Sequence, residues 1–152
     1  MSGCVKLTNY GIDGEHHLEL RKGIPYRGIM PDLNGRRYLN YIWAYELSEI
    51  AGKPCKLLLD RAKKLKKLIK DELWSKDDNW FYFINKNEKN IRYTVQMYKL
   101  INNQLLDEEE EYGLLSHLNE EEFLSDFGLH SISKKDIAYD QIDIDNGGGG
   151  AC

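Results

Sequence analysis

The sequence lacks a long apolar run, a disulfide framework and a secretory leader. No segment approaches the ~18 apolar residues that a membrane span needs, so we expect no membrane partner. The N-terminus has no basic start followed by an apolar block, which predicts a cytoplasmic chain without a secretory signal. Three cysteines, Cys4, Cys55 and Cys152, are odd in number and far apart. Their spacing indicates neither a metal site nor a set of disulfides.

Common catalytic fingerprints are also missing. The sequence contains no nucleophile elbow, no Walker loop and no Rossmann glycine pattern. His16 and His17 are adjacent and would face opposite ways on a strand, whereas His117 and His130 are isolated. We interpret all four as hydrogen-bonding or surface histidines rather than as ligands. The sequence therefore predicts neither a metal nor another cofactor.

The composition is that of a globular chain. With 152 residues, 41% hydrophobic and 30% charged, it suffices for one ordinary domain and excludes a disordered or collagen-like chain. The net charge of −4 argues against a nucleic-acid partner. Basic residues dominate 53–76, whereas acidic residues dominate 107–145. We interpret these stretches as solvated helix faces that attract each other or neighbouring parts of a larger protein, with a phosphate-binding patch on 53–76 as the alternative.

Turn-forming residues and then helical periodicity divide the chain. Glycine, proline and asparagine recur through 1–37, which predicts an irregular N-terminal segment. From about 38 to 51, apolar residues recur at steps of four, four and three, which predicts a helix with one buried face. These residues are Leu39, Trp43, Leu47 and Ile50. Gly52 and Pro54 then mark a stop, and an amphipathic pattern over about 56–74 predicts a second helix, antiparallel to the first.

Beyond residue 74 the pattern predicts a β-hairpin followed by shorter helices. Aromatic and β-branched residues in 80–84 and 91–95 flank a polar turn over 85–90. Helices are expected over about 95–106 and 107–117, the latter opened by acidic residues. A further short helix is predicted to begin at Asn119, with Glu122 as its capping-box partner, and to end at Gly128. The fold class is therefore mainly α, built of αα-hairpins with one small β-hairpin.

The last segment combines aspartates with glycines. After Tyr139, alternation places Asp143 and Asp145 on one face of an extended strand, and Asn146 leads into the glycines 147–150. Carboxylate and amide oxygens beside open backbone suit a ligand rich in hydroxyl groups. A polar surface strand and, more weakly, a calcium loop are the alternatives. Because a patterned segment leads directly into the glycines, we interpret the chain as a fragment cut within a site loop, rather than as one that ends in a flexible tail.

Three blocks carry a resemblance in combination. They are RYLNY through AG at 37–52, the LW end of 68–74 with WFY at 80–82, and a stretch over 113–139 that contains GLLSHL, EFL, FGLHSIS and DIAY. Together they resemble the six-hairpin, or (α/α)6-barrel, glycoside hydrolases, in the branch of processing α-glucosidases and trehalase-like enzymes. The resemblance implies that residues 38–152 form part of an (α/α)6 toroid that is truncated at its C-terminus.

The resemblance also implies an activity and a set of site residues. Inverting hydrolysis of an oligosaccharide or glycoside uses one carboxyl group as acid and a second as base. This sequence has no counterpart of the acid-bearing motif and ends before the base, so the catalytic residues are unassigned and this chain alone is expected to be inactive. It also reads Asp-Asn-Gly-Gly at 145–148 where many relatives have a Trp-Arg-Gly-Pro-like run. The expected sugar-binding residues are Asn40, Trp43, Tyr139, Asp143, Asp145, Asn146, Gly147 and Gly148.

Two other classes of function stay open from the sequence. A non-catalytic carbohydrate-binding or helical interaction module would need no second carboxylate. A nucleic-acid binder that uses 53–76 is the third candidate. As part of a toroid, the chain is further expected to expose apolar surface and to self-associate through it.

Overall fold

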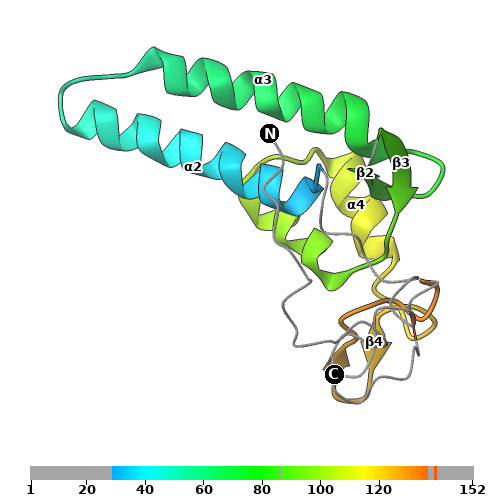
Figure 1. Ribbon diagram of the computed structural model, residues 1–152. Helices are drawn as coiled ribbons and strands as arrows, with labels where there is room; N and C mark the ends of the chain where they lie inside the picture. The colour runs from blue at the N-terminus through cyan, green and yellow to red at the C-terminus, as the bar shows by residue number, and fades with distance from the viewer. Residues whose placement is uncertain (1–28, 86, 137–138, 140–152) are drawn as a thin grey trace, which may run out of the picture.

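A computed structural model describes residues 29–85, 87–136 and 139 of the chain. This described part is about 52% helical, in four helices, and carries a small antiparallel sheet. A long helical hairpin projects from a smaller body that holds the sheet and the remaining helices (Figure 1). The expected mainly α chain is confirmed at this coarse level. None of the described helices combines the length and the apolar character needed to span a bilayer.

The first described helix, α2, spans Pro31–Ile50 and begins earlier than the predicted start near residue 38. Pro31 fits the first helical turn, where its fixed φ is suitable and no N–H donor is needed. Gly35 is buried inside the helix, and a Cβ there would lie 2.3 Å from Cδ2 of Leu100. Residues 31–37 are therefore helical, and the assignment of them to an irregular segment was wrong. Their glycine serves a close contact rather than a turn.

The second helix, α3, spans Lys56–Leu73 and packs antiparallel to α2 (Figure 1). The predicted stop between the two helices is confirmed, because Gly52 has a φ of +68° and donates its N–H to the carbonyl oxygen of Glu49. This left-handed conformation after a helix is one that glycine adopts at little cost. Ala62 and Ile69 form the buried side of α3 against α2. The predicted helical hairpin is therefore present.

The prediction that the apolar face of α2 is buried was wrong for the half of the helix that ends at Ile50. Trp43, Leu47 and Ile50 are 53%, 65% and 83% exposed, respectively. A different side of α2 is buried, on which Tyr41 and Ile42 pack against the core cluster. The apolar periodicity thus marks a face that the described residues leave uncovered. We call Trp43, Leu47 and Ile50 the α2 flank.

The predicted β-hairpin is confirmed and belongs to a three-stranded antiparallel sheet. Its strands are β1 (Trp74–Ser75), β2 (Trp80–Asn85) and β3 (Glu88–Ile91), in the order β1-β2-β3. Strand β3 begins inside the segment that was predicted to be a turn. In the register of the hairpin, Tyr82 lies opposite Ile91.

The helix predicted over 95–106 is a shorter 3₁₀ helix, η3, over Val95–Asn103. Its buried residues Met97, Leu100 and Asn103 are spaced by three. A 3₁₀ helix places residues three apart on the same side, so this spacing suits it better than an α-helix. Gln104 ends the helix in the left-handed conformation. Through Leu100, η3 fills the space that Gly35 leaves open on α2.

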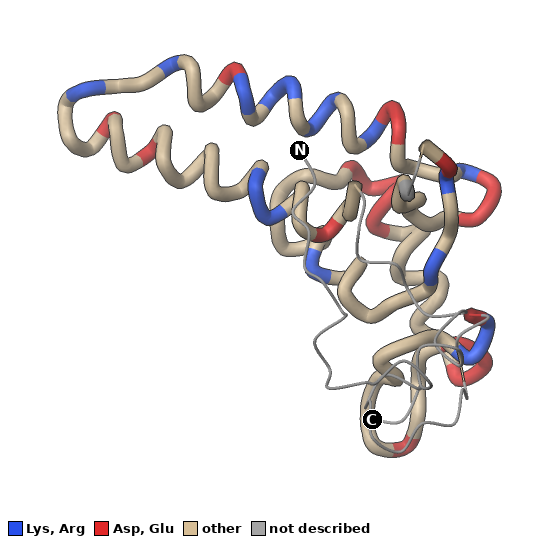
Figure 2. Tube along the Cα trace, in the orientation of Figure 1, with Lys and Arg blue, Asp and Glu red and all other residues tan. Residues whose placement is uncertain are grey.

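Helix α4, over Glu108–Ser116, confirms the predicted acidic helix start. The Glu110 carboxylate accepts the backbone N–H of Asp107 at 2.8 Å, which satisfies a donor just before the first turn. Lys70 of α3 forms ion pairs with Asp107 and with Glu110, and Figure 2 shows lysine and arginine recurring along α3. The interpretation of 53–76 and 107–145 as mutually attracting stretches is therefore confirmed at this contact.

We expect this contact to make stability depend on acid pH. The hydrogen bond from Lys70 lowers the pKa of Asp107 below its ordinary value of 3.8. A group whose pKa is lower in the folded state than in the unfolded state stabilises the fold at any pH above its unfolded-state pKa. This stabilisation is lost as the pH falls through the folded-state pKa. Since Asp107 is largely exposed, the loss should be about 0.2–1 kcal/mol. Urea unfolding at pH 7 and pH 3 measures the difference in the free energy of unfolding between the two pH values. Asp107→Asn should make this difference smaller. A difference as large as in the unmodified chain would contradict the role given to Asp107.

The prediction of a short helix over 119–128 was wrong. The chain instead forms turns and two short paired strands, β4 (Leu124–Ser125) and β5 (Gly128–Leu129). The Glu122 side chain, expected to cap this helix, contacts the His117 ring at 2.7 Å instead. Because His117, which lies outside the segment, binds the Glu122 carboxylate, this carboxylate does not form the predicted capping box.

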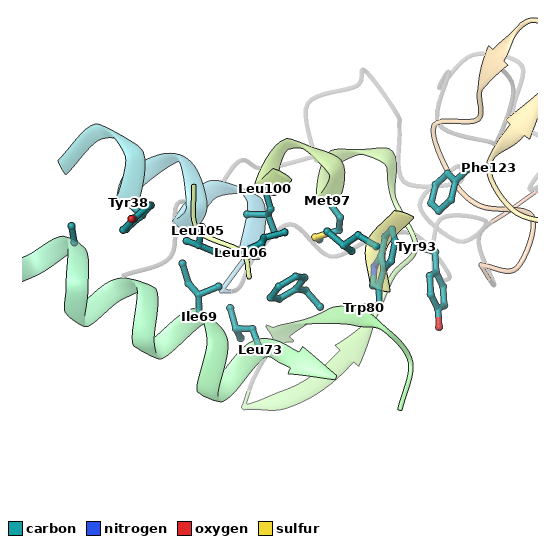
Figure 3. Close-up of a cluster of buried hydrophobic side chains, with 13 residues drawn as sticks. Tyr38, Ile69, Leu73, Trp80, Tyr93, Met97, Leu100, Leu105, Leu106 and Phe123 are labelled. Atoms are coloured by element: carbon teal, nitrogen blue, oxygen red, sulfur yellow. The ribbon is translucent and has the colours of Figure 1, made fainter. Parts of the chain in front are cut away.

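The core lies where the base of the helical hairpin meets the sheet, η3 and α4. Its side chains from α3, β2 and η3 point toward one another (Figure 3). Trp80 and Phe81 of β2 are fully buried there. Gly113 of α4 allows Trp74 to approach, because a Cβ at Gly113 would lie 2.8 Å from Cη2 of that ring. The core thereby joins three of the segments that carried the resemblance.

Candidate functional site

The predicted sugar-binding residues fall into three groups: five residues beyond Tyr139, then Asn40 with Trp43 on α2, and Tyr139 itself. Asp143, Asp145, Asn146, Gly147 and Gly148 lie outside the described residues.

The described members of the set are not brought together. Asn40 and Trp43 lie exposed on α2. The Tyr139 ring meets the His130 ring, which directly follows β5, at 5.6 Å between centroids. Helix α2 and the β4–β5 strands lie at opposite ends of the described part (Figure 1). Within the described residues, Asn40 and Trp43 therefore lie apart from Tyr139, and the candidate site is built from Tyr139.

Tyr139 is half-buried and fixed by two contacts. Its backbone N–H donates to the carbonyl oxygen of Asp136 at 3.0 Å. Its ring meets His130 edge-on, with an interplanar angle of 88°, an arrangement that aromatic pairs favour. The hydrogen bond to Asp136 and the ring contact together set where this side chain lies.

Asp136 is itself held by a buried ion pair. One carboxylate oxygen accepts from Nη1 of Arg92 at 2.9 Å, and the other accepts the backbone N–H of Tyr93 at 2.8 Å. The side chains of Arg92 and Asp136 are only 10% and 1% exposed, respectively. Charge-assisted hydrogen bonds in such a water-poor setting are strong and directional. We call these two residues the Arg92–Asp136 pair.

The segment before Asp136 runs antiparallel to residues 92–95. The N–H of Ser133 donates to the carbonyl oxygen of Tyr93 at 2.9 Å, and the N–H of Val95 donates to that of Ser131 at 3.0 Å. Thr94 and Ile132 form a β-bridge between the two segments. Residues 131–133 are thus attached to the end of the β-hairpin.

A second polar contact joins His117 and Glu122. Nδ1 of the buried His117 lies 2.7 Å from a carboxylate oxygen of Glu122, and its Nε2 lies 3.0 Å from the carbonyl oxygen of Asp78. Since a carbonyl oxygen only accepts, this contact places a hydrogen on Nε2. The interpretation of His117 as a hydrogen-bonding histidine is confirmed.

Tyr93 connects the two polar contacts. Burial raises the pKa of its hydroxyl to about 12, and the carboxylates of Asp78, Glu122 and Asp136 act in the same direction. The hydroxyl therefore stays protonated at neutral pH. Nζ of Lys135 lies over the ring, 5.0 Å from its centroid, an attraction between a cation and an aromatic face.

These groups support the site rather than perform chemistry themselves. The contacts of these groups include the Arg92–Asp136 pair, the His117–Glu122 contact, two hydrogen bonds to the backbone, and an ion pair between Lys135 and Glu122. Within the described ranges, no cluster of three or more histidine, cysteine, aspartate or glutamate side chains is suited to a metal ion. The arrangement can hold one aromatic side chain, Tyr139, in a fixed place, and the predicted ligand-binding segment follows it in the sequence.

No family model, curated protein or solved structure matches this chain. Function is therefore inferred from the residues and their contacts.

Proposed function

We propose that this chain is part of an inverting glycoside hydrolase of the (α/α)6 type that acts on an oligosaccharide or glycoside. The observation that carries the proposal is the α2 flank on a projecting helical hairpin. A helix buries its apolar stripe against another element in a stable fold. In a toroid of helical hairpins, a neighbouring hairpin supplies that element.

The exposure of the α2 flank fits this role. Isolated exposed apolar residues are common on protein surfaces, but three that recur along one helix face form a continuous patch. Trp43, Leu47 and Ile50 form such a series. On α3, Leu57 and Leu68 are also about half exposed. A second amphipathic helix is the simplest cover for a straight apolar stripe.

The packing of the resembling blocks supports the same proposal. The Trp80 ring stacks on Phe123 at 5.6 Å between centroids and meets His117 edge-on at 4.9 Å. Gly113 receives the ring of Trp74. The residues that carry the resemblance therefore contact one another in one packed unit, and the chain leads from that unit into the predicted sugar-binding segment.

The α2 flank should cause self-association when nothing else covers it. We expect sedimentation velocity to show oligomers that grow with protein concentration, and Leu47→Lys with Ile50→Lys to shift the chain toward monomer. Phe127→Lys is the control, because Phe127 is 96% exposed but lies on the β4–β5 turn. Monomeric behaviour of the unmodified chain at all concentrations would contradict the role proposed for the flank.

The predicted sugar contacts provide a direct test. Asp143→Ala and Asp145→Ala should each weaken binding, because one hydrogen bond between a charged group and a ligand is worth about 1.5–3 kcal/mol, or roughly ten- to a hundredfold in Kd. Titration of the chain with glucose, trehalose and maltose, followed by NMR, measures the effect. Asp126→Ala, at an exposed aspartate, is the matched control. Unchanged Kd values in both variants would place the site elsewhere.

A helical interaction module is the second candidate, favoured by the same α2 flank. It predicts capture of a partner helix with no saturable sugar binding. The sugar titration therefore separates the two proposals, since only the first requires a response of Tyr139 and the aspartates to sugar.

A further inference from the structure

We infer that the Arg92–Asp136 pair is a positioning device for Tyr139, and that it sets the aromatic surface on which the sugar ring of the proposed function rests. The inference rests on that proposed function for its ligand. Its structural part, the coupling of the ion pair to Tyr139, rests on the described contacts alone.

The contacts form a continuous path from the core to Tyr139. The indole N–H of Trp80, a fully buried residue, donates to the carbonyl oxygen of Arg92 at 2.9 Å. The guanidinium of Arg92 donates to the carboxylate of Asp136. The carbonyl oxygen of Asp136 then accepts the N–H of Tyr139. Each step uses a directional hydrogen bond, so displacement of the carboxylate is transmitted to the next turn of the chain.

Asp136 is suited to this role because both of its carboxylate oxygens are used. One contacts a side chain and the other a backbone N–H, which fixes the rotation of the carboxylate as well as its distance. An amide in its place keeps one acceptor but presents an NH₂ group to a donor. Asp136 would then be held mainly by its own N–H, which donates to the carbonyl oxygen of Ser133.

Tyr139 is suited to contact a sugar. Its ring is half-buried, and His130 meets it edge-on, so packing restricts the ring on one side. An aromatic side chain presents an apolar body and a polar tip, which matches the C–H face and the hydroxyl edge of a sugar. A ring that is fixed before binding loses less conformational entropy on binding than a mobile one.

Hydrogen exchange tests the structural part. In Asp136→Asn, we expect the amides of Ser133, Asp136 and Tyr139 to exchange about tenfold faster, the effect of losing one hydrogen bond to a charged group. Amides of the α2–α3 hairpin should keep their rates. Glu72→Gln is the matched control, because it removes one carboxylate from the exposed pair with Lys89. Unchanged exchange at Tyr139, or equally faster exchange throughout the chain, overturns the inference.

A second variant covers the case in which Asp136→Asn does not fold. Arg92→Lys keeps the charge but loses the planar donor arrangement. It should produce the same local pattern with a smaller increase in rate.

Sugar titration tests the functional part. With glucose, trehalose and maltose as probes, Asp136→Asn should weaken the Kd about as much as Tyr139→Ala does, whereas Glu72→Gln should leave it unchanged. A Kd that stays at the wild-type value despite faster exchange at Tyr139 overturns the positioning role. If the unmodified chain binds none of the three sugars, the proposed function fails, while the exchange result still decides whether the pair holds Tyr139.

Discussion

Trp80→Ala is expected to lower the free energy of unfolding by about 3–5 kcal/mol, the range for removal of a large aromatic side chain from a core. Trp80 is fully buried. Its ring stacks on Phe123 and lies 5.2 Å from the ring of Tyr93. Its N–H also satisfies the carbonyl oxygen of Arg92, so the truncation removes a hydrogen bond together with the packed ring.

The chain offers a matched control for this prediction. Trp43→Ala removes the same side chain from the α2 flank, where it is more than half exposed. Exposed substitutions usually change stability by less than about 0.5 kcal/mol. Urea unfolding followed by circular dichroism compares the two variants at low protein concentration, at which self-association is minimal. Equal losses would show that the core does not lie around Trp80.

The parts of the fold that follow from local spacing were predicted from the sequence. Helix α3 and the β-hairpin depend on periodicity within 56–73 and 80–91, and both are present. The start of α2 was not predicted, because Gly35 reads locally as a turn residue. Its actual role depends on Leu100, which is distant in the sequence. A contact of this kind leaves no signal in the neighbouring residues.

Competition from distant partners also explains the failure over 119–128. Local spacing offered Glu122 as a cap for Asn119, but the carboxylate binds His117 instead. The same limit applies to the candidate site. Tyr139 was identified from its segment, whereas Arg92 and Asp136 are 44 residues apart. No periodicity connects residues at that distance, so their pairing became visible only in the structure.

Asp136→Ala is expected to cost about 3–5 kcal/mol of stability, although it removes only a small side chain. The reason is the charge that stays behind. Arg92 is 90% buried and loses the carboxylate that lies 2.9 Å from its Nη1, and removal of one partner of a buried ion pair is strongly destabilising. The N–H of Tyr93 loses its acceptor as well. Glu72→Ala, which breaks the exposed pair with Lys89, should cost less than about 1 kcal/mol by the same urea measurement.

A double-mutant cycle separates the charge from the packing in this prediction. Arg92→Met alone should also be strongly destabilising, because it removes the positive charge that lies 2.9 Å from the buried Asp136 carboxylate. Arg92→Met combined with Asp136→Ala removes both charges, so its cost should fall short of the sum of the two single costs by at least about 1 kcal/mol. Some cost should remain, since the N–H of Tyr93 still lacks an acceptor. Additive costs would mean that the two residues stabilise the segment before Tyr139 by separate contacts rather than as a pair.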